Sequence, residues 1–238
     1  MDDFYLFANC NFVPDQYAAW QAAYDDLATY VYAKEPTTKT YYFGIPLDYA
    51  HDFNKTTSML AFEVYRRRED LYTTHLNSSA MSTFLKRIAP TTTTNLDLSH
   101  YRLTAGFLDL PSTTVEAGII QNIRITCVSS STRTSLLTHL SQLVNNVYQE
   151  ELANDGNGGV LTYMVFLCLD DDVGVRVLGR WRNREDMEGF VRRTDLGLLW
   201  QGQKAGVARM EQRYYVPNGK GWLHRGGARA KGGLNAKS

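Results

Sequence analysis

Apolar and polar residues alternate over 60–65, and this period of two predicts a β-strand because successive strand side chains point to opposite faces. The acidic pair at 69–70 then opens a helical turn, since negative charge suits the free N–H groups of a helix start. After a break at 77–79, apolar residues over 81–88 recur at spacings of three, four and seven, which is typical of one helix face. A strand therefore feeds a helix that folds back over it. His75 lies where the helical segment is interrupted, and it is the most chemically informative residue of the chain.

The same periodicities predict the elements around this segment. A helix is expected from Pro14 to Glu35, where Pro36 ends it because proline disfavours the helical conformation in the residue before it. The polar stretch 46–57 is expected to connect two strands. The expected strands of this half are 4–12, 39–45, 60–65 and about 96–107. The order strand, helix, strand, strand, helix, strand is that of a ferredoxin-like unit.

The pattern returns at a fixed offset of 116 residues, which predicts an internal repeat. The tripeptide 68–70 meets 184–186, and the aromatic residues Tyr65 and Phe84 meet Trp181 and Trp200. The apolar stripe Trp20, Tyr24, Leu27 and Val31 meets Leu136, Leu140, Leu143 and Val147. A chance register would not return all three features together.

We therefore predict an α+β fold of two tandem ferredoxin-like (βαββαβ) repeats that form an intrachain pseudo-dimeric α+β barrel. The first repeat is expected over 1–110 and the second over 117–218, joined by a linker. Each sheet carries helices on one face only, so the other copy is the expected cover for the second face. A basic, glycine-rich tail over 219–238 is expected to be flexible.

Composition narrows the classes of partner. The chain has 238 residues, of which 44% are hydrophobic, enough for a sizeable core. The formal charge is zero, but the tail holds five basic residues and no acid, which leaves 20 basic against 25 acidic residues in 1–218. Such an acidic body is a poor candidate for nucleic-acid binding.

The N-terminal residues and the cysteines indicate which cellular compartment to expect. The N-terminus carries two acids and no long apolar run, so neither a signal peptide nor a membrane span is expected, and the protein is expected to be cytoplasmic. Three cysteines far apart in the sequence argue against a disulfide framework and a zinc site, and they are expected to be buried thiols.

Two segments, EPTTKTYYF at 35–43 and FEVYRRREDLYTTHLNSSAMSTF at 62–84, resemble the antibiotic-biosynthesis monooxygenase family of dimeric α+β barrels. Members of that family show an E-P-G-x-x-x-Y-like turn, a strand that ends near an aromatic residue, and the motif H-L-x-S-x-x-F-x-x-F. The match covers most of the first half and is weaker over the second. The resemblance implies a pocket between sheet and helices that binds a small aromatic molecule, often a polyketide. It also implies oxygenation without metal or flavin, or a cyclisation or rearrangement, so no cofactor is expected.

Carried over position by position, the resemblance implies a set of pocket residues. His75 is the histidine of the H-L-x-S motif, and Tyr65 is the strand-end aromatic residue, with Trp181 as its counterpart in the second half. Asn9 or Asn11 corresponds to the asparagine on the first strand of some members. The other residues expected to line the pocket are Trp20, Tyr24, Tyr41, Glu63 and Phe84.

Three positions depart from the family pattern. Val191 stands in the second half where the first has His75, so the reactive pocket is expected in the first half and the second is expected to be mainly structural. Ala61 replaces the asparagine that quinone-forming members carry, a departure from the anthrone-oxidising site. Leu85 stands near the position of the histidine that haem-degrading relatives use, which argues against haem cleavage.

Each candidate residue also has a plainer interpretation. His75 could hydrogen-bond a helix end instead of acting as a general base, since an imidazole serves either purpose. Trp20 and Tyr24 fit a packing stripe, and Tyr65 fits a core aromatic residue whose hydroxyl has found a partner. Glu63, if buried, needs a partner or a raised pKa.

The leading hypothesis is a cofactor-independent monooxygenase that acts on a small aromatic or polyketide-derived substrate in secondary metabolism. His75 would remove a proton, the carbanion would pass an electron to oxygen, and Asn9, Tyr41 or Tyr65 would hold the enolate oxygen. A cyclase or isomerase needs the same base without oxygen, and a non-catalytic small-molecule-binding protein needs neither. The five histidines show no metal-ligand spacing. The expected partners are the aromatic substrate and molecular oxygen. Neither nucleic acid nor a membrane is expected as a partner, and the sequence leaves open whether the protein forms a homo-oligomer.

Overall fold

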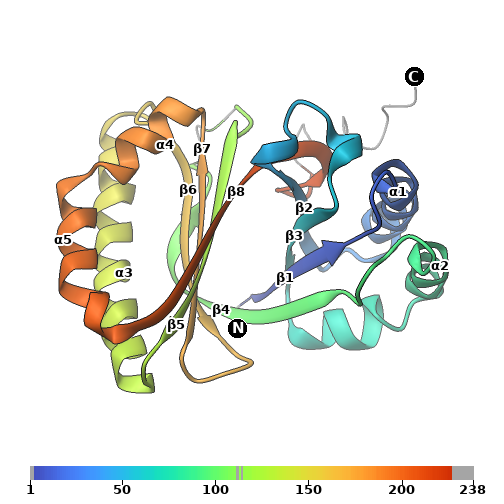
Figure 1. The fold of residues 1–238 in the computed structure, drawn as a ribbon, viewed down its shortest axis with the longest axis horizontal. Coiled ribbons are helices and arrows are strands. Elements are labelled where there is room, and N and C mark those ends of the chain that lie inside the picture. Colours follow the sequence, from blue (N-terminus) through green and yellow to red (C-terminus); the bar gives the residue numbers. More distant parts are fainter. Residues whose placement is uncertain (1–2, 111–112, 114, 227–238) are drawn as a thin grey trace. The chain divides into compact units, whose positions relative to one another are not determined.

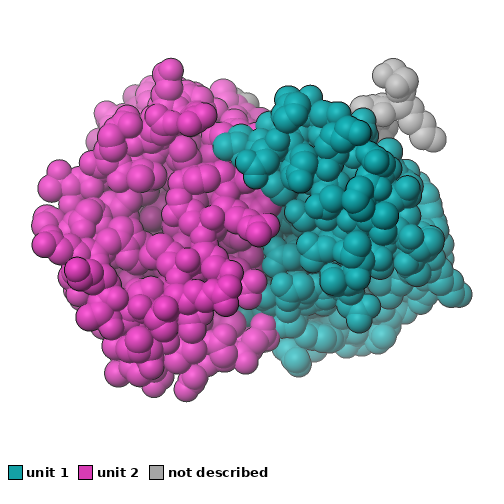
Figure 2. All heavy atoms as spheres, in the orientation of Figure 1, with its two compact units in different colours: residues 1–100, 217–238 teal, residues 101–216 magenta. Residues whose placement is uncertain are grey.

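The computed structural model describes residues 3–110, 113 and 115–226. The chain divides into two compact units, which Figure 2 distinguishes by colour. Unit 1 comprises residues 1–100 and 217–238, and unit 2 comprises residues 101–216. Along the chain, β4 (Asp97–Leu108) begins in unit 1 and ends in unit 2, and β8 (Val207–Trp222) does the reverse.

Unit 1 contains a sheet with two helices on one of its faces (Figure 1). Strand β3 lies between β1 and β2 and pairs antiparallel with both. The elements are β1 (Phe4–Asn11), α1 (Tyr17–Lys34), β2 (Thr38–Pro46), β3 (Ser58–Tyr65) and α2 (Ser79–Ile88). Two 3-10 turns, Leu47–Tyr49 and Phe53–Lys55, occupy the connection from β2 to β3, and a π-helical turn, Asp70–His75, precedes α2.

Local chemistry explains where the helices of unit 1 begin and end. Ser78 caps α2, because its hydroxyl accepts the backbone N–H of Met81 at 3.0 Å. The apolar stripe of α1 is buried against the sheet, as the spacing predicts. Glu35 ends α1, since its backbone N–H still bonds to the carbonyl of Val31 while Pro36 follows.

Unit 2 contains three whole strands and the larger parts of β4 and β8. Their hydrogen-bonded order is β8-β5-β7-β6-β4, and every pairing with a described register is antiparallel. Its elements are β5 (Ile119–Cys127), α3 (Ser130–Ala153), β6 (Val160–Cys168), β7 (Gly174–Trp181), α4 (Arg184–Val191), α5 (Thr194–Gln203) and a 3-10 turn (Lys204–Gly206) before β8. Ser129 and Thr132 form a capping box at the start of α3. Helices α3 and α5 run along the same side of this sheet (Figure 1).

The predicted α+β class and the order of the elements are confirmed in the described residues. Two features of the predicted fold stay predictions. One is that the two halves are duplicate ferredoxin-like repeats, and the other is that they form a pseudo-dimeric barrel. The strand β8 continues to Trp222, which is buried, so an irregular tail cannot begin at Gly219 as expected. The rest of the predicted tail, 227–238, lies outside the described residues.

Two further expectations concern the described part of the chain. Cys10, Cys127 and Cys168 are buried free thiols, as expected. In the ranges that the structure covers, no helix combines the length and the apolar character needed to cross a membrane.

Candidate functional site

A buried carboxylate lies between the sheet and the helices of unit 1. Glu63 on β3 is 3% exposed, and both of its oxygens accept hydrogen bonds from tyrosines. The hydroxyl of Tyr24 on α1 donates to Oε1 at 2.9 Å, and the hydroxyl of Tyr65 donates to Oε2 at 2.6 Å. Burying a carboxylate is costly unless such partners hold it. The tyrosines therefore keep Glu63 in one orientation inside the core.

A second carboxylate pairs with the predicted histidine. Oε2 of Glu35 lies 2.8 Å from Nδ1 of His75, and each side chain is only 2% exposed. Glu35 follows the last turn of α1, and His75 closes the π-helical turn, a kind of local irregularity that is frequent at functional sites. With the proton on Nδ1 facing the carboxylate, the lone pair of Nε2 is left for a second partner. The side chain of His75 therefore bonds to Glu35 and not to a helix end.

Aromatic rings enclose these groups. The ring of Tyr41 meets His75 edge-on at 5.8 Å and stacks on Tyr24 at 5.4 Å. Trp20 stacks on Tyr24 from the other side at 5.0 Å, and Phe84 lies 5.0 Å from Tyr24. Nε1 of Trp20 is buried and has no hydrogen-bond partner among the described residues. The predicted residues His75, Tyr65, Tyr41, Glu63, Trp20, Tyr24 and Phe84 are thus brought together in one buried cluster.

Burial sets the protonation of this cluster. It raises the pKa of the Glu63 carboxyl, and the nearby His75 and the two tyrosine hydrogen bonds oppose that rise. Burial also raises the pKa values of Tyr24, Tyr41 and Tyr65 well above their ordinary range. The three hydroxyls therefore stay protonated near neutral pH, and those of Tyr24 and Tyr65 donate to Glu63.

Replacing Glu63 with glutamine is expected to change how stability depends on pH. Because the pKa of Glu63 is raised from 4.5 on folding, the folded state holds its proton more tightly, and this stabilisation is lost as pH rises through the raised value. The unfolding free energy of the wild type should therefore fall relative to Glu63→Gln as pH rises from the ordinary carboxyl pKa through the raised one, by about 1.4 kcal/mol for each tenfold change in proton affinity. Urea unfolding at several pH values measures this difference. The exposed Glu69→Gln is the matched control, and parallel curves for wild type and Glu63→Gln would contradict the assignment.

The asparagines of β1 do not join the cluster, which corrects the expected grouping. In the antiparallel register Leu6 pairs with Glu63, and Asn9 is three residues further along β1, so its side chain points to the opposite face of the sheet. Asn9 donates to Oδ2 of Asp97 at 3.0 Å, and Asn11 on that same face donates to Thr94 at 3.2 Å. Neither amide is placed to hold an oxygen next to His75.

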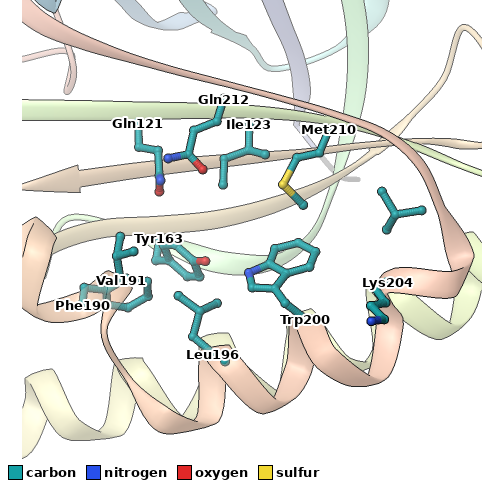
Figure 3. A pocket seen from close by; sticks show the side chains of 12 residues that line it. Gln121, Ile123, Tyr163, Phe190, Val191, Leu196, Trp200, Lys204, Met210 and Gln212 are labelled. Carbon is teal, nitrogen blue, oxygen red and sulfur yellow. The ribbon is translucent and has the colours of Figure 1, made fainter.

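Unit 2 contains a cavity of about 430 Å³ (Figure 3). It lies between strands β5, β6 and β8 on one side and helices α4 and α5 on the other. Its walls are Gln121, Ile123, Tyr163, Phe190, Val191, Leu196, Gly197, Trp200, Lys204, Val207, Met210 and Gln212. The expectation that the second half is mainly structural did not anticipate this cavity.

The strand register relates this cavity to the cluster of unit 1. Tyr41 pairs with Glu63 in unit 1, and Tyr163 pairs with Gly179 in unit 2, 116 positions after Glu63. The place of the buried carboxylate is therefore taken by a glycine. The ring of Trp181 lies over Gly179, fully buried behind Tyr163 and Phe190, at 6.4 Å and 5.5 Å between ring centres. Trp181, predicted as a pocket residue, is not among the cavity walls.

Adding a methyl group at Gly179 is expected to destabilise unit 2. A Cβ atom there would overlap the six-membered ring of Trp181, which is completely buried and cannot move aside. We expect Gly179→Ala to lower the free energy of unfolding by about 3 kcal/mol. Chemical denaturation measures the loss. Gly189→Ala is the control because its Cβ would meet no atom within 4 Å, and an equal effect of the two substitutions would contradict this account of the packing.

Sequence reasoning missed Glu35 and most of the cavity walls. The sequence marks Glu35 only as a helix end and as part of the E-P turn, and its contact with His75 joins segments 40 residues apart. The repeat offset aligns Trp200 with Phe84 in the sequence, but it gives no reason to expect an open space beside Trp200. Within the described residues, no group of three or more His, Cys, Asp or Glu side chains is placed to hold a metal ion.

Comparison with known proteins shows which solved structures have a similar fold. No protein-family model matches the chain, and no curated protein matches it. Among solved structures, a "putative monooxygenase" from Fusobacterium nucleatum has a TM-score of 0.72 at 11% identity, over 91% of this chain and 92% of that one. These likenesses establish the fold.

Two further solved structures agree with the first. A "putative monooxygenase" from Lactobacillus acidophilus has a TM-score of 0.66 at 9% identity, over 91% of this chain and 94% of that one. An "anthrone oxidase-like protein" has a TM-score of 0.62 at 12% identity, over 91% and 92%. The fold is therefore one that proteins described as monooxygenases share, although a fold alone does not fix an activity.

Proposed function

We propose that this protein is a monooxygenase that oxidises a small, electron-rich aromatic molecule without a bound cofactor, with His75 as the general base. The observation that carries the proposal is the 2.8 Å contact between Glu35 and Nδ1 of His75 inside the core. Taking an acid–base pair out of water is costly, so a buried pair of this kind is a candidate for chemistry. The likeness in fold to proteins described as monooxygenases supports the choice of reaction.

The chemistry begins with proton removal. Glu35 holds the proton of His75 on Nδ1, so Nε2 accepts a proton from an acidic carbon or hydroxyl of the substrate. The resulting carbanion passes one electron to molecular oxygen, and the two radicals combine to a peroxide that takes the proton back. Loss of the second carbon proton then breaks the O–O bond, so that a methylene group and O₂ become a carbonyl group and water.

A donor beside His75 stabilises the enolate form of the substrate. The hydroxyl of Tyr41 remains protonated, has no hydrogen-bond partner among the described residues, and belongs to a ring 5.8 Å from that of His75. Fixed donors of this kind favour charge that develops on an oxygen during the reaction. Glu63 orients Tyr24 and Tyr65 and so fixes the shape of the enclosure.

A cleft between α1 and α2 is the proposed side of entry. A cavity of about 180 Å³ there has Leu27, Phe84 and Arg87 among its walls. Phe84 lines this cavity, and its ring lies 5.0 Å from that of Tyr24, which donates to Glu63. Rotation of one aromatic side chain would therefore open a path toward the buried cluster, on the time scale of side-chain motion.

Oxygen uptake by the purified protein tests the proposed function. Anthrone is a suitable probe because its methylene group is acidic and its oxidation by O₂ gives anthraquinone and water. We expect uptake of one O₂ for each anthraquinone formed, at a rate above the uncatalysed oxidation and unchanged by a metal chelator. Conversion of an aromatic polyketide that proceeds equally well under argon would instead favour the cyclase or isomerase.

A further inference from the structure

The cavity of unit 2 has the size of a small-molecule site. Its volume of about 430 Å³ falls in the range of ligand pockets, which is roughly 300–1,000 Å³. In Figure 3 the side chains of Trp200, Leu196 and Phe190 face those of Ile123 and Met210 across the open space. Aromatic and aliphatic walls on two opposing sides favour a flat, apolar ligand.

Polar atoms of Tyr163, Trp200 and Gln121 face this space without a partner among the described residues. Tyr163 is 2% exposed, burial raises the pKa of its hydroxyl, and that hydroxyl donates to no described residue. Figure 3 shows the Tyr163 hydroxyl and the indole nitrogen of Trp200 turned into the cavity. Gln121, 3% exposed, donates through Nε2 to the hydroxyl of Tyr214 at 3.3 Å, which leaves its carbonyl oxygen as an acceptor. These three residues thus offer two donors and one acceptor.

The chemistry of the walls differs from that of unit 1. The twelve lining residues include no carboxylate, imidazole or thiol, so no group there can act as a strong base near neutral pH. Lys204 at the rim adds one positive charge. The position of His75 in unit 1 corresponds to Val191 here, which is a wall of the cavity. The walls therefore supply apolar contacts and hydrogen-bonding groups but no general base.

We propose that unit 2 binds a planar aromatic molecule of two or three rings that carries a carbonyl oxygen and a phenolic hydroxyl, at a site separate from the His75 cluster. The carbonyl accepts from Tyr163 and Trp200, and the hydroxyl donates to Gln121. The rings stack among Phe190, Leu196 and Trp200. This site is independent of the proposed oxygenation. The two units then have different functions, because one holds an acid–base cluster and the other a ligand-binding pocket.

Calorimetric titration of the full-length protein with 7-hydroxycoumarin tests the proposal. This probe is flat and has a carbonyl and a hydroxyl at opposite ends. We expect binding to the wild type, about fivefold weaker binding to Tyr163→Phe because one hydrogen bond is lost, and weaker binding of 7-methoxycoumarin, which has no hydroxyl to donate. Gly197→Phe should abolish binding, since a side chain at Gly197 enters open space and fills the cavity.

The matched control for the filled cavity is Gly202→Phe. Gly202 lies on the same helix, α5, and its Cβ also meets no atom within 4 Å, but it does not line the cavity. This variant should bind like the wild type and show that a phenylalanine on α5 is tolerated. His75→Asn should also bind normally. Absence of binding to the wild type, full binding to Gly197→Phe, or loss of binding in His75→Asn would each overturn the proposal, and none of them tests oxygen uptake.

Discussion

Replacing His75 with asparagine is expected to lower the rate of oxygen-dependent turnover by between about 100-fold and 10,000-fold, the range typical for loss of a general base. The asparagine amide can still donate to Glu35, as Nδ1 of His75 does at 2.8 Å, but it offers no basic nitrogen toward the substrate. The substitution therefore removes the base and keeps the buried hydrogen bond. Initial rates of oxygen uptake with anthrone measure the loss.

The controls separate chemistry from folding. His51→Asn changes an exposed histidine and should leave the rate as in the wild type. Glu35→Gln should also lower the rate, because the neutral amide no longer stabilises the positive charge that His75 gains when Nε2 takes up a proton. Circular dichroism checks that all variants fold. A folded His75→Asn protein with the wild-type rate would remove His75 from the mechanism.

The second large effect concerns stability. Removal of either partner of the Glu35–His75 pair leaves the other buried without its hydrogen bond, and such losses typically cost about 3–5 kcal/mol. We expect Glu35→Ala and His75→Ala each to fall in this range. The double variant leaves no unpaired group, so it should cost less than the sum of the two, with a coupling free energy of about 2 kcal/mol. Urea unfolding of the four proteins gives each term.

An exposed pair provides the comparison for this cycle. Arg184 and Glu188 are 2.8 Å apart on α4, and both are substantially exposed, so a cycle on this pair should give a coupling below about 1 kcal/mol. If the Glu35–His75 cycle gave a coupling as small as this, the two side chains would not be a tightly held buried pair, and the proposed orientation of the imidazole would lose its support.

The regular elements could be predicted from sequence because their signals are local. The alternation over 60–65 gave β3, the stripe over 81–88 gave α2, and Pro36 marked the end of α1. The chain past Gly219 was mispredicted because glycine and basic residues indicate flexibility, whereas pairing in the sheet keeps β8 extended to Trp222. Tertiary packing overrides composition at such positions.

The candidate site was predictable only in part, because its contacts join distant segments. The spacing of Glu63 and Tyr65 on one strand placed them on one face, and the hydrogen bond between them follows from it. If the pairing of β1 with β3 were known, the same alternation would place Asn9 and Glu63 on opposite faces of the sheet. That pairing cannot be read from either strand alone. Glu35 and His75 are 40 residues apart, so no local pattern could show their contact.

The open space in unit 2 was unpredictable for a different reason. The sequence shows that Gly179 follows Glu63 by 116 residues, but a smaller side chain can leave a gap or let a neighbour fill it. Here the ring of Trp181 fills the space over Gly179, and the cavity has Tyr163 and Phe190 among its walls. Which outcome occurs depends on side-chain packing, which only coordinates reveal.

The most direct test of His75 as the base separates proton removal from oxygen chemistry. Anthrone in D₂O under argon exchanges its methylene hydrogens slowly, and a positioned base accelerates that exchange without any oxygen. Proton NMR should show exchange with the wild-type protein at least tenfold faster than the uncatalysed rate, and only the uncatalysed rate with His75→Asn. Equal exchange rates for the two proteins would contradict the central claim.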